Sequence, residues 1–398
     1  MTGGRRIRSR VLLIAHLAVL AAACKGDSSF EGTTSVTMQA IESVTSVVAS
    51  QPSTTVARGS WFLVWTSARL PDGFEEILEE LPGVDAVSVV WAGNAPITET
   101  RESDGKPVDQ APEGFWYPVE LQWIDPEAHR PFVPPDVADL LAGMSSDEVL
   151  LTESSAELRR LGSGATIGLA EGIELRVVGV VADRWVGAAE LVTTSPGGAD
   201  LGANVPRYAI VRYAGTREDL ERALVEVVAE PVRVRSEDGT TVFRHADAVR
   251  SQVDIKLRFG EFALRPGDGT RIEIDPVWVD SNIVTRELSL LGTASCHRDF
   301  ADMLERVMTQ LEAAGLAHVI DSGAFLGCWN PRFIAGRRDL SRHAWGVAAD
   351  INFGNPVNGP GSPTEPRLID AMTEAGITSG KDWLKPDPGH FEWYGTDS

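Results

Sequence analysis

The stretch LSRHAWGVAADIN, residues 340–352, places an imidazole and a carboxylate among small side chains. Glycine and alanine let a backbone turn tightly and let other groups approach it closely. Residues 346–352 are mostly apolar and predict a short buried strand with Asp350 near its end, while His343 lies in the loop before it. We therefore expect the two side chains to converge on one point, as two ligands of a metal ion would.

A third ligand is expected in the stretch KPDPGHFEWYG, residues 385–395, which has the character of an extended segment around His390. Catalytic zinc commonly takes three protein ligands and keeps a fourth position for water, and two histidines with one aspartate suit zinc. His343, Asp350 and His390 would form such a set. Asp387 is badly placed to be a fourth ligand, so we expect it to act as the base that takes a proton from water.

Both stretches resemble motifs of the VanY-like D-Ala-D-Ala carboxypeptidase family of zinc peptidases, which also includes L-alanyl-D-glutamate endopeptidases. The resemblance extends from the FGEF stretch at residue 259 to the end of the chain. The first motif, S-x-H-x-x-G-x-A-x-D, is matched by Ser341, His343, Gly346, Ala348 and Asp350. The second motif, an acidic residue shortly before His-Phe-Glu, is matched by Asp387, His390, Phe391 and Glu392. An upstream aromatic-x-Pro-Arg element is matched by Trp329, Pro331 and Arg332.

The resemblance implies a role for further residues beside the zinc ligands and the Asp387 base. Arg332 would pair with the substrate or with charge that develops on the scissile carbonyl, and its alternative is a surface ion pair. Ser341 would donate a hydrogen bond to substrate, and its alternative is a hydroxyl that caps a loop. Trp383 is assigned to substrate binding, although the Gly-Gly pair that often precedes it in relatives is replaced here by residues 378–380, Thr-Ser-Gly.

The N-terminus has the features of an export signal. A basic region with four arginines precedes a short apolar run, Val11–Ala23, which is too short for a comfortable transmembrane helix. The run ends in LAAAC and resembles the lipobox of bacterial lipoproteins, which implies that Cys24 is lipidated and anchors the protein to a membrane. The alternative is an ordinary cleaved signal with an incidental cysteine. Residues 25–60 are rich in Ser and Thr and predict a tether.

The chain holds three cysteines, Cys24, Cys296 and Cys328. If Cys24 carries lipid, an even pair remains in an exported chain, and we expect Cys296 and Cys328 to form a disulfide. The alternative is two buried free thiols.

Residues 61–235 alternate between strand and helix patterns and predict an α+β domain of their own. The stretches LLTESSAELRRLG, residues 150–162, and IELRVVGVVAD, residues 173–183, resemble the extracytoplasmic domain of MacB-like and FtsX-like permeases. No cluster of metal-binding or nucleophilic residue types occurs in this region. We therefore expect a binding or positioning domain, and we leave open an envelope protein as its partner.

Residues 240–398 predict an α+β zinc peptidase domain with a small antiparallel sheet and flanking helices. We expect strands over 253–264 and 271–279, joined by the turn RPGDG, a helix over 297–316, and a strand and turn over 317–329. The whole chain has 398 residues and a net charge of −21, which argues against nucleic acid as a partner because phosphate binding needs clustered basic residues.

The sequence therefore predicts an extracytoplasmic Zn²⁺ peptidase that hydrolyses a peptidoglycan stem peptide. We expect D-alanyl-D-alanine carboxypeptidase activity, with L-alanyl-D-glutamate endopeptidase activity as the alternative. A hypothesis of another class is a non-catalytic envelope lipoprotein in which the zinc is structural.

Overall fold

The computed structural model describes residues 61–187, 189–194, 198–236, 250–335, 339–354 and 365–395. The predicted signal segment with Cys24 and the predicted tether lie outside the described residues. The residues that are described belong to one compact unit, so the predicted boundary between residues 235 and 240 stays a prediction. In this part of the chain, no helix is both long enough and apolar enough to cross a membrane.

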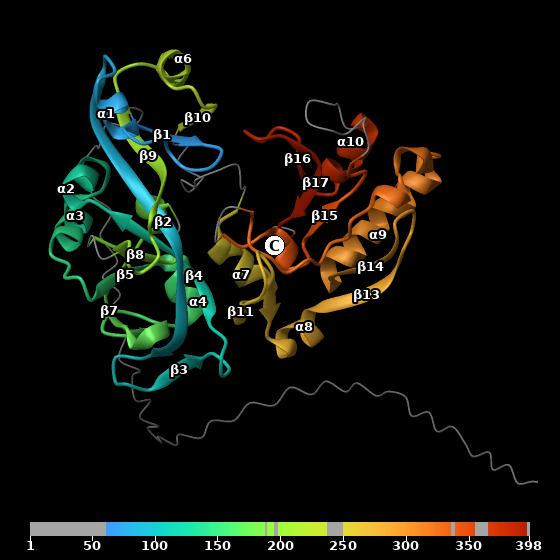
Figure 1. The fold of residues 1–398 in the computed structure, drawn as a ribbon, viewed down its shortest axis with the longest axis horizontal. Helices are drawn as coiled ribbons and strands as arrows, with labels where there is room; N and C mark the ends of the chain where they lie inside the picture. The colour runs from blue at the N-terminus through green and yellow to red at the C-terminus, as the bar shows by residue number, and fades with distance from the viewer. Residues whose placement is uncertain are drawn as a thin grey trace, which may run out of the picture. The chain divides into compact units, whose positions relative to one another are not determined.

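The first region is built on one ten-stranded mixed sheet with the long strand β2, Val84–Arg101, as its axis (Figure 1). β2 pairs antiparallel with β9 along its first half, with β4 along its middle and with β6 and β3 near its end. In order of pairing, the strands are β10 (Val232–Ser236), β1 (Trp61–Thr66), β9 (Val205–Tyr213), β2, β4 (Tyr117–Ile124), β8 (Leu191–Thr193), β5 (Glu148–Thr152), β7 (Glu174–Val181) and β6 (Thr166–Leu169), with β3 (Pro107–Gln110) paired to β2 alone.

Alternating side chains explain how this sheet is covered on both faces. In β1, Leu63 and Trp65 join one apolar cluster, whereas Phe62 and Val64 join another, as expected when successive residues point to opposite faces. Helices pack on these faces through apolar residues at helical spacing. The helices of this region are α1 (Phe74–Glu79), α2 (Pro126–His129), α3 (Pro135–Ala142), α4 (Glu153–Arg159), α5 (Asp183–Val186) and α6 (Arg217–Val227).

The second region contains three small antiparallel sheets and the long helix α9, Arg298–Ala313. The predicted helix over 297–316 is confirmed, and so are the hairpin at RPGDG and the short buried strand that holds Asp350. The sheets consist of β11 (Leu264–Pro266) with β12 (Ile272–Ile274), of β13 (Ile283–Leu288) with β14 (Gly292–His297), and of β15 (Ala348–Asp350), β17 (Asp387–Trp393) and β16 (Ile377–Gly380). The other helices are α7 (Gln252–Phe259), α8 (Pro276–Asn282) and α10 (Pro366–Glu374).

The expected strand over 253–264 is wrong, because residues 252–259 form α7. Ser251 caps the helix by accepting a hydrogen bond from the backbone of Asp254, and Gly260 with φ 86° ends it. The side chains of Gln252, Ile255 and Phe259 are buried at helical spacing. The expected strand over 271–279 is present only as β12, because α8 follows it. In the segment 317–329, residues 317–319 and 322–324 form 3₁₀ turns instead of the expected strand.

Candidate active site

The three predicted metal ligands converge on one point. Asp350 in β15 lies directly opposite His390 in the antiparallel strand β17, so their side chains share one face of the sheet. Asp350 Oδ1 is 2.8 Å from His390 Nδ1 and 3.2 Å from Nε2 of His343, which lies in the 3₁₀ turn Arg342–Ala344. One potential ligand atom from each residue lies within 4.8 Å of the other two.

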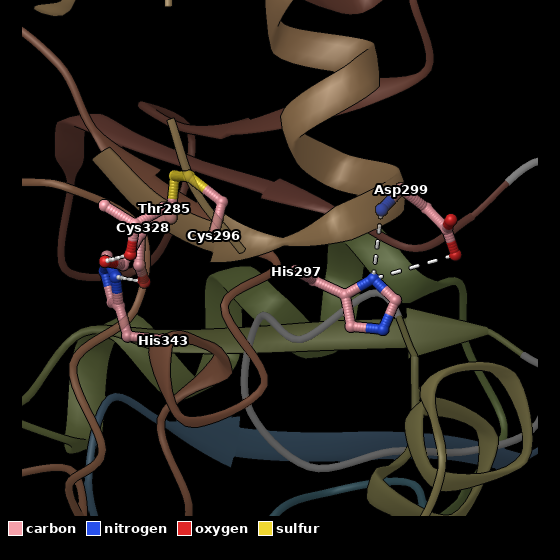
Figure 2. Close-up of a disulfide and its surroundings, with 7 residues drawn as sticks. Thr285, Cys296, His297, Asp299, Cys328 and His343 are labelled. Atoms are coloured by element: carbon pink, nitrogen blue, oxygen red, sulfur yellow. Dashed lines mark hydrogen bonds and ion pairs between the residues drawn. A yellow bond between two sulfur atoms is a disulfide. The ribbon is translucent and has the colours of Figure 1, made fainter. Parts of the chain in front are cut away.

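The outward-facing ring nitrogens of both histidines are held by acceptors. His343 Nδ1 lies 2.8 Å from the carbonyl oxygen of Cys328, which can only accept, so this nitrogen carries a proton (Figure 2). Nε2 of the same ring faces Asp350. His390 Nε2 lies 3.0 Å from Glu392 Oε1, and the hydroxyl of Tyr394 also donates to Glu392. Histidines that bind metals usually donate their other N–H in this way, so the residues fit a zinc ion.

The charges at this point favour a cation. Burial would raise the pKa of Asp350, but hydrogen bonds and charge from His343 and His390 outweigh it and hold that pKa far below its usual range. Burial would lower the pKa of His390, but the carboxylates of Asp350 and Glu392 raise it to about 10. The ring is therefore doubly protonated in the absence of metal, and a bound cation would replace the proton on Nδ1.

Small residues let this segment pack as the sequence predicts. Gly346 has φ 69°, and a Cβ there would lie 2.6 Å from the backbone nitrogen of His297. That nitrogen donates to the carbonyl oxygen of Gly346 at 2.9 Å. Ala348 and Ala349 are fully buried. The close contact therefore fixes the loop that carries His343 against the end of β14.

The predicted disulfide between Cys296 and Cys328 is present. It joins β14 to the segment whose carbonyl oxygen holds His343, as Figure 2 shows. The neighbouring His297 is turned toward Asp299 instead and accepts a hydrogen bond from the Asp299 backbone at 3.3 Å, so it caps α9. The disulfide therefore braces one histidine of the site, whereas His297 serves the helix.

Asp387 lies at the start of β17, next to a bulge. Gly380 pairs with Asp387 while Ser379 pairs with Phe391, so residues 388–390 are left without partners in β16. Such bulges re-aim side chains near active sites. Burial raises the pKa of Asp387, and the charge of Asp350 raises it further, while that of His390 opposes the shift. A half-buried carboxylate with a raised pKa is a stronger base than an exposed one.

The residues predicted to bind substrate lie around this group. Arg332 Nη1 donates to Ser341 Oγ at 3.0 Å, and the same oxygen accepts from the backbone of His343 at 3.3 Å. Ser341 therefore caps the turn that carries His343, and its hydrogen bond to substrate stays a prediction. The Trp383 ring centroid lies 5.1 Å from that of His390. The contact between Arg332 and Ser341, nine residues apart, is not predictable from spacing alone.

Comparison with known proteins agrees with this geometry. Residues 335–393 match the model of a family described as D-alanyl-D-alanine carboxypeptidase. The C-terminal region carries a peptidase domain of this type. The match contains Ser341, His343, Asp350, Asp387 and His390, whereas Arg332 and both cysteines lie before it. No curated protein matches the sequence.

Solved structures similar to this chain include a periplasmic region, a permease domain and an extracellular transporter domain. The periplasmic region of MacB from Actinobacillus actinomycetemcomitans is 12% identical, with a TM-score of 0.31, and the match covers 45% of this chain and 90% of that one. A permease domain from Porphyromonas gingivalis is 18% identical, with a TM-score of 0.30 and coverage of 48% and 93%. The extracellular domain of the transporter YknZ from Gram-positive bacteria is 12% identical, with a TM-score of 0.27 and coverage of 44% and 100%.

Sequence reasoning did not find two of the groups that support the site. The carbonyl oxygen of Cys328 orients His343, and the hydroxyl of Tyr394 donates to Glu392. A backbone carbonyl carries no sequence signal. The contact of Tyr394 with Glu392 is predictable from the second motif, because residues i and i+2 of an extended segment share a face.

Proposed function

We propose that this protein is an exported zinc peptidase that acts on peptidoglycan stem peptides, with D-alanyl-D-alanine carboxypeptidase activity. The observation that carries the proposal is the convergence of His343, Asp350 and His390 within 4.8 Å, with the outward nitrogens of both histidines held by hydrogen bonds. The family match of residues 335–393 supports a peptidase and suggests the type of bond.

The chain supplies the groups that hydrolysis of an amide requires. His343, Asp350 and His390 would hold zinc, which would lower the pKa of a bound water to about 7. Asp387 takes the proton from the attacking water and later delivers it to the leaving amine. Arg332 lies beside Ser341 and donates hydrogen bonds to the oxyanion that develops on the scissile carbonyl or to the terminal carboxylate of the substrate.

Export is supported by the N-terminal sequence and by the disulfide. The basic region, the apolar run and Cys24 have the order of a lipoprotein signal. A disulfide such as Cys296–Cys328 persists in oxidising compartments outside the cytoplasm. We therefore place the protein in the bacterial cell envelope, attached by lipid at Cys24.

The bond is tested by product analysis. The purified full chain would be incubated with a muropeptide that carries an intact pentapeptide stem, in the presence of zinc and, separately, of a chelator. Mass spectrometry is expected to show loss of one terminal alanine that chelator prevents and added zinc restores. Cleavage between the first two residues of the stem would instead identify the L-alanyl-D-glutamate endopeptidase.

A third outcome would change the class of function. If zinc is bound and no product forms, the function is that of an envelope binding lipoprotein with a structural zinc, or of a peptidase for an unrelated peptide substrate. The half-buried Asp387 beside the metal ligands favours the enzyme, because a structural zinc site needs no base.

A further inference from the structure

A second feature next to the proposed catalytic residues is a pocket of about 540 Å³. One wall comes from the ten-stranded sheet region and the other from β16 and the segment that follows it. The residues that decide its chemistry are Trp65, Arg217, Arg233, Arg235, Asp382 and Trp383. The pocket is therefore built jointly by residues from both parts of the described chain.

The lining of this pocket reverses the charge balance of the chain. The protein has 57 acidic and 36 basic residues, yet the lining holds three arginines and one aspartate. Arg217 is already paired with Glu218 at 2.7 Å. Arg233 donates to the main-chain oxygen of Asp382 at 2.6 Å, and it forms no ion pair with any described residue. Its positive charge is therefore available to an anion.

The neighbouring Arg235 adds a second cation with a fixed position. Its guanidinium carbon lies 5.0 Å from the centroid of the buried Trp65 ring, an arrangement that holds the plane of the group. Arg233 and Arg235 are two residues apart in β10 and both line the pocket. Guanidinium groups that are held in place are well suited to carboxylates, because they donate parallel hydrogen bonds.

Trp383 connects the pocket to the proposed catalytic site. It lines the pocket, and its ring centroid lies 5.1 Å from that of His390. Thr378 and Ser379 of β16 also line the pocket. A peptide bound at the metal ligands would therefore reach the pocket by passing one aromatic side chain.

We propose that this pocket is a subsite for a carboxylate of the peptide substrate, with Arg233 and Arg235 as the groups that bind it. The inference rests on the proposed function and adds a specificity element from the sheet region. In a stem peptide, the glutamate residue carries a free carboxylate within three residues of either candidate bond. An extended chain spans about 3.3–3.6 Å per residue, so this carboxylate lies at most about 11 Å from the bond that is cut.

The test is a binding measurement that does not require turnover. Calorimetry would compare two stem pentapeptides, with the glutamate carboxylate free or converted to an amide, on the full chain kept metal-free by a chelator. We expect the free carboxylate to bind about tenfold more tightly, as charge-assisted hydrogen bonds do. Arg233→Gln combined with Arg235→Gln should remove this preference. Arg222→Gln, which removes the same charge from the exposed face of α6, should leave it intact.

Each result decides the inference independently of the catalytic proposal. Equal affinity for the two peptides on the wild-type chain, or a preference that survives the double substitution, would overturn the subsite. If the double variant does not give a native circular dichroism spectrum, Arg233→Gln alone is measured and must lower the preference. If the chain prefers the peptide with the free carboxylate but does not hydrolyse it in the presence of zinc, the subsite stands and the catalytic proposal fails. If the chain hydrolyses the peptide but shows no such preference, the catalytic proposal stands and the subsite fails. If inorganic phosphate displaces the peptide from the wild-type chain but not from the double variant, this would support Arg233 and Arg235 as the groups that bind the anion.

Discussion

Two buried clusters of charged side chains in this protein have opposite designs. The first, which we call the catalytic cluster, consists of His343, Asp350 and His390. The second, which we call the core charge cluster, consists of Arg159, Glu190, Lys256 and Glu261.

The core charge cluster is closed. Arg159 lies 2.7 Å from Glu190 and 2.8 Å from Glu261, and Lys256 lies 2.8 Å from each of the same two carboxylates. Two cations face two anions, so the charges cancel. Burial alone would raise the pKa of Glu261, but Arg159 and Lys256 hold it well below its usual value. The cluster has no charge left for a ligand, and it ties α4 to α7.

The catalytic cluster is open, which means that its one carboxylate has no permanently charged partner within the cluster. Its charge is balanced only when a cation or protons are added. His343 and His390 both point a ring nitrogen at Asp350 Oδ1, and their outer nitrogens are occupied by Cys328 and Glu392. The comparison teaches that burial of charge is not itself a sign of function. The sign is the convergence of ligand atoms on a position that a cation can fill.

The largest expected effect is at Asp387, the proposed base beside the catalytic cluster. Asp387→Asn should lower kcat by about 10²–10⁴-fold, because a general base contributes about that much, while the zinc content of the protein stays unchanged. Steady-state hydrolysis of the stem peptide and metal analysis measure the two quantities. Asp302→Asn, an exposed position on α9, is the matched control. Retained hydrolysis in Asp387→Asn would mean that another group takes the proton.

Substitution in the core charge cluster should lower the stability of the protein, whereas substitution of Asp387 should lower its activity. Lys256→Met leaves two buried carboxylates with one cation, which should lower the free energy of unfolding by about 3–5 kcal/mol. Urea denaturation followed by circular dichroism measures the change. Lys106→Met removes an exposed lysine paired with Asp104 and should leave the midpoint unchanged. A Lys256→Met variant as stable as the wild type would show that the closed cluster does not hold α7 in place.

A buried imidazole outside both clusters provides a comparison without carboxylates. His129 Nε2 donates to the carbonyl oxygen of Trp185 at 3.2 Å, so the neutral ring accepts from the Ser88 hydroxyl through Nδ1 at 2.9 Å. Burial lowers its pKa from 6.5 to about 4, so the unfolded chain binds a proton more readily than the folded one between these values. The contribution of neutral His129 to the free energy of unfolding is therefore complete above pH 6.5 and is lost as the pH falls toward 4.

The loss can be measured as a difference between two proteins. At pH 5 the wild type should lose about 2 kcal/mol of stability through His129, from the shift between 6.5 and about 4. The His129→Gln variant lacks this dependence, so the gap between the two proteins should narrow by that amount between pH 7 and pH 5. Parallel urea curves over this range, with a constant gap, would show that His129 does not titrate on unfolding.

The smallest expected effect tests the outer shell of the catalytic cluster. Glu392→Gln keeps the shape of the side chain but removes the charge that faces His390 Nε2, so zinc affinity should fall by about tenfold. Competition with a chromophoric chelator measures this without any substrate. Glu374→Gln at an exposed position of α10 is the control. Unchanged affinity in Glu392→Gln would restrict the role of this carboxylate to its contact with Tyr394.

Much of the catalytic cluster is predictable because its residues lie in two short segments with a strict order of types. Residues 341–350 and 387–392 carry the three converging residues and Asp387, the proposed base, and strand pairing brings Asp350 opposite His390. The disulfide follows from the number of cysteines and from export. The pocket next to Trp383 is not predictable, because Arg233 and Asp382 are 149 residues apart and meet only in the folded chain.

The sequence by itself predicted the three residues that converge at the candidate site, the disulfide pair and the elements with strong local patterns, such as α9. The tertiary structure decided the state of residues 252–259. Their alternation of apolar and polar residues is typical of a strand, yet they form a helix with Lys256 buried against Glu190, 66 residues away. Local periodicity assumes that a charged residue faces water, and a buried partner distant in the sequence removes that assumption.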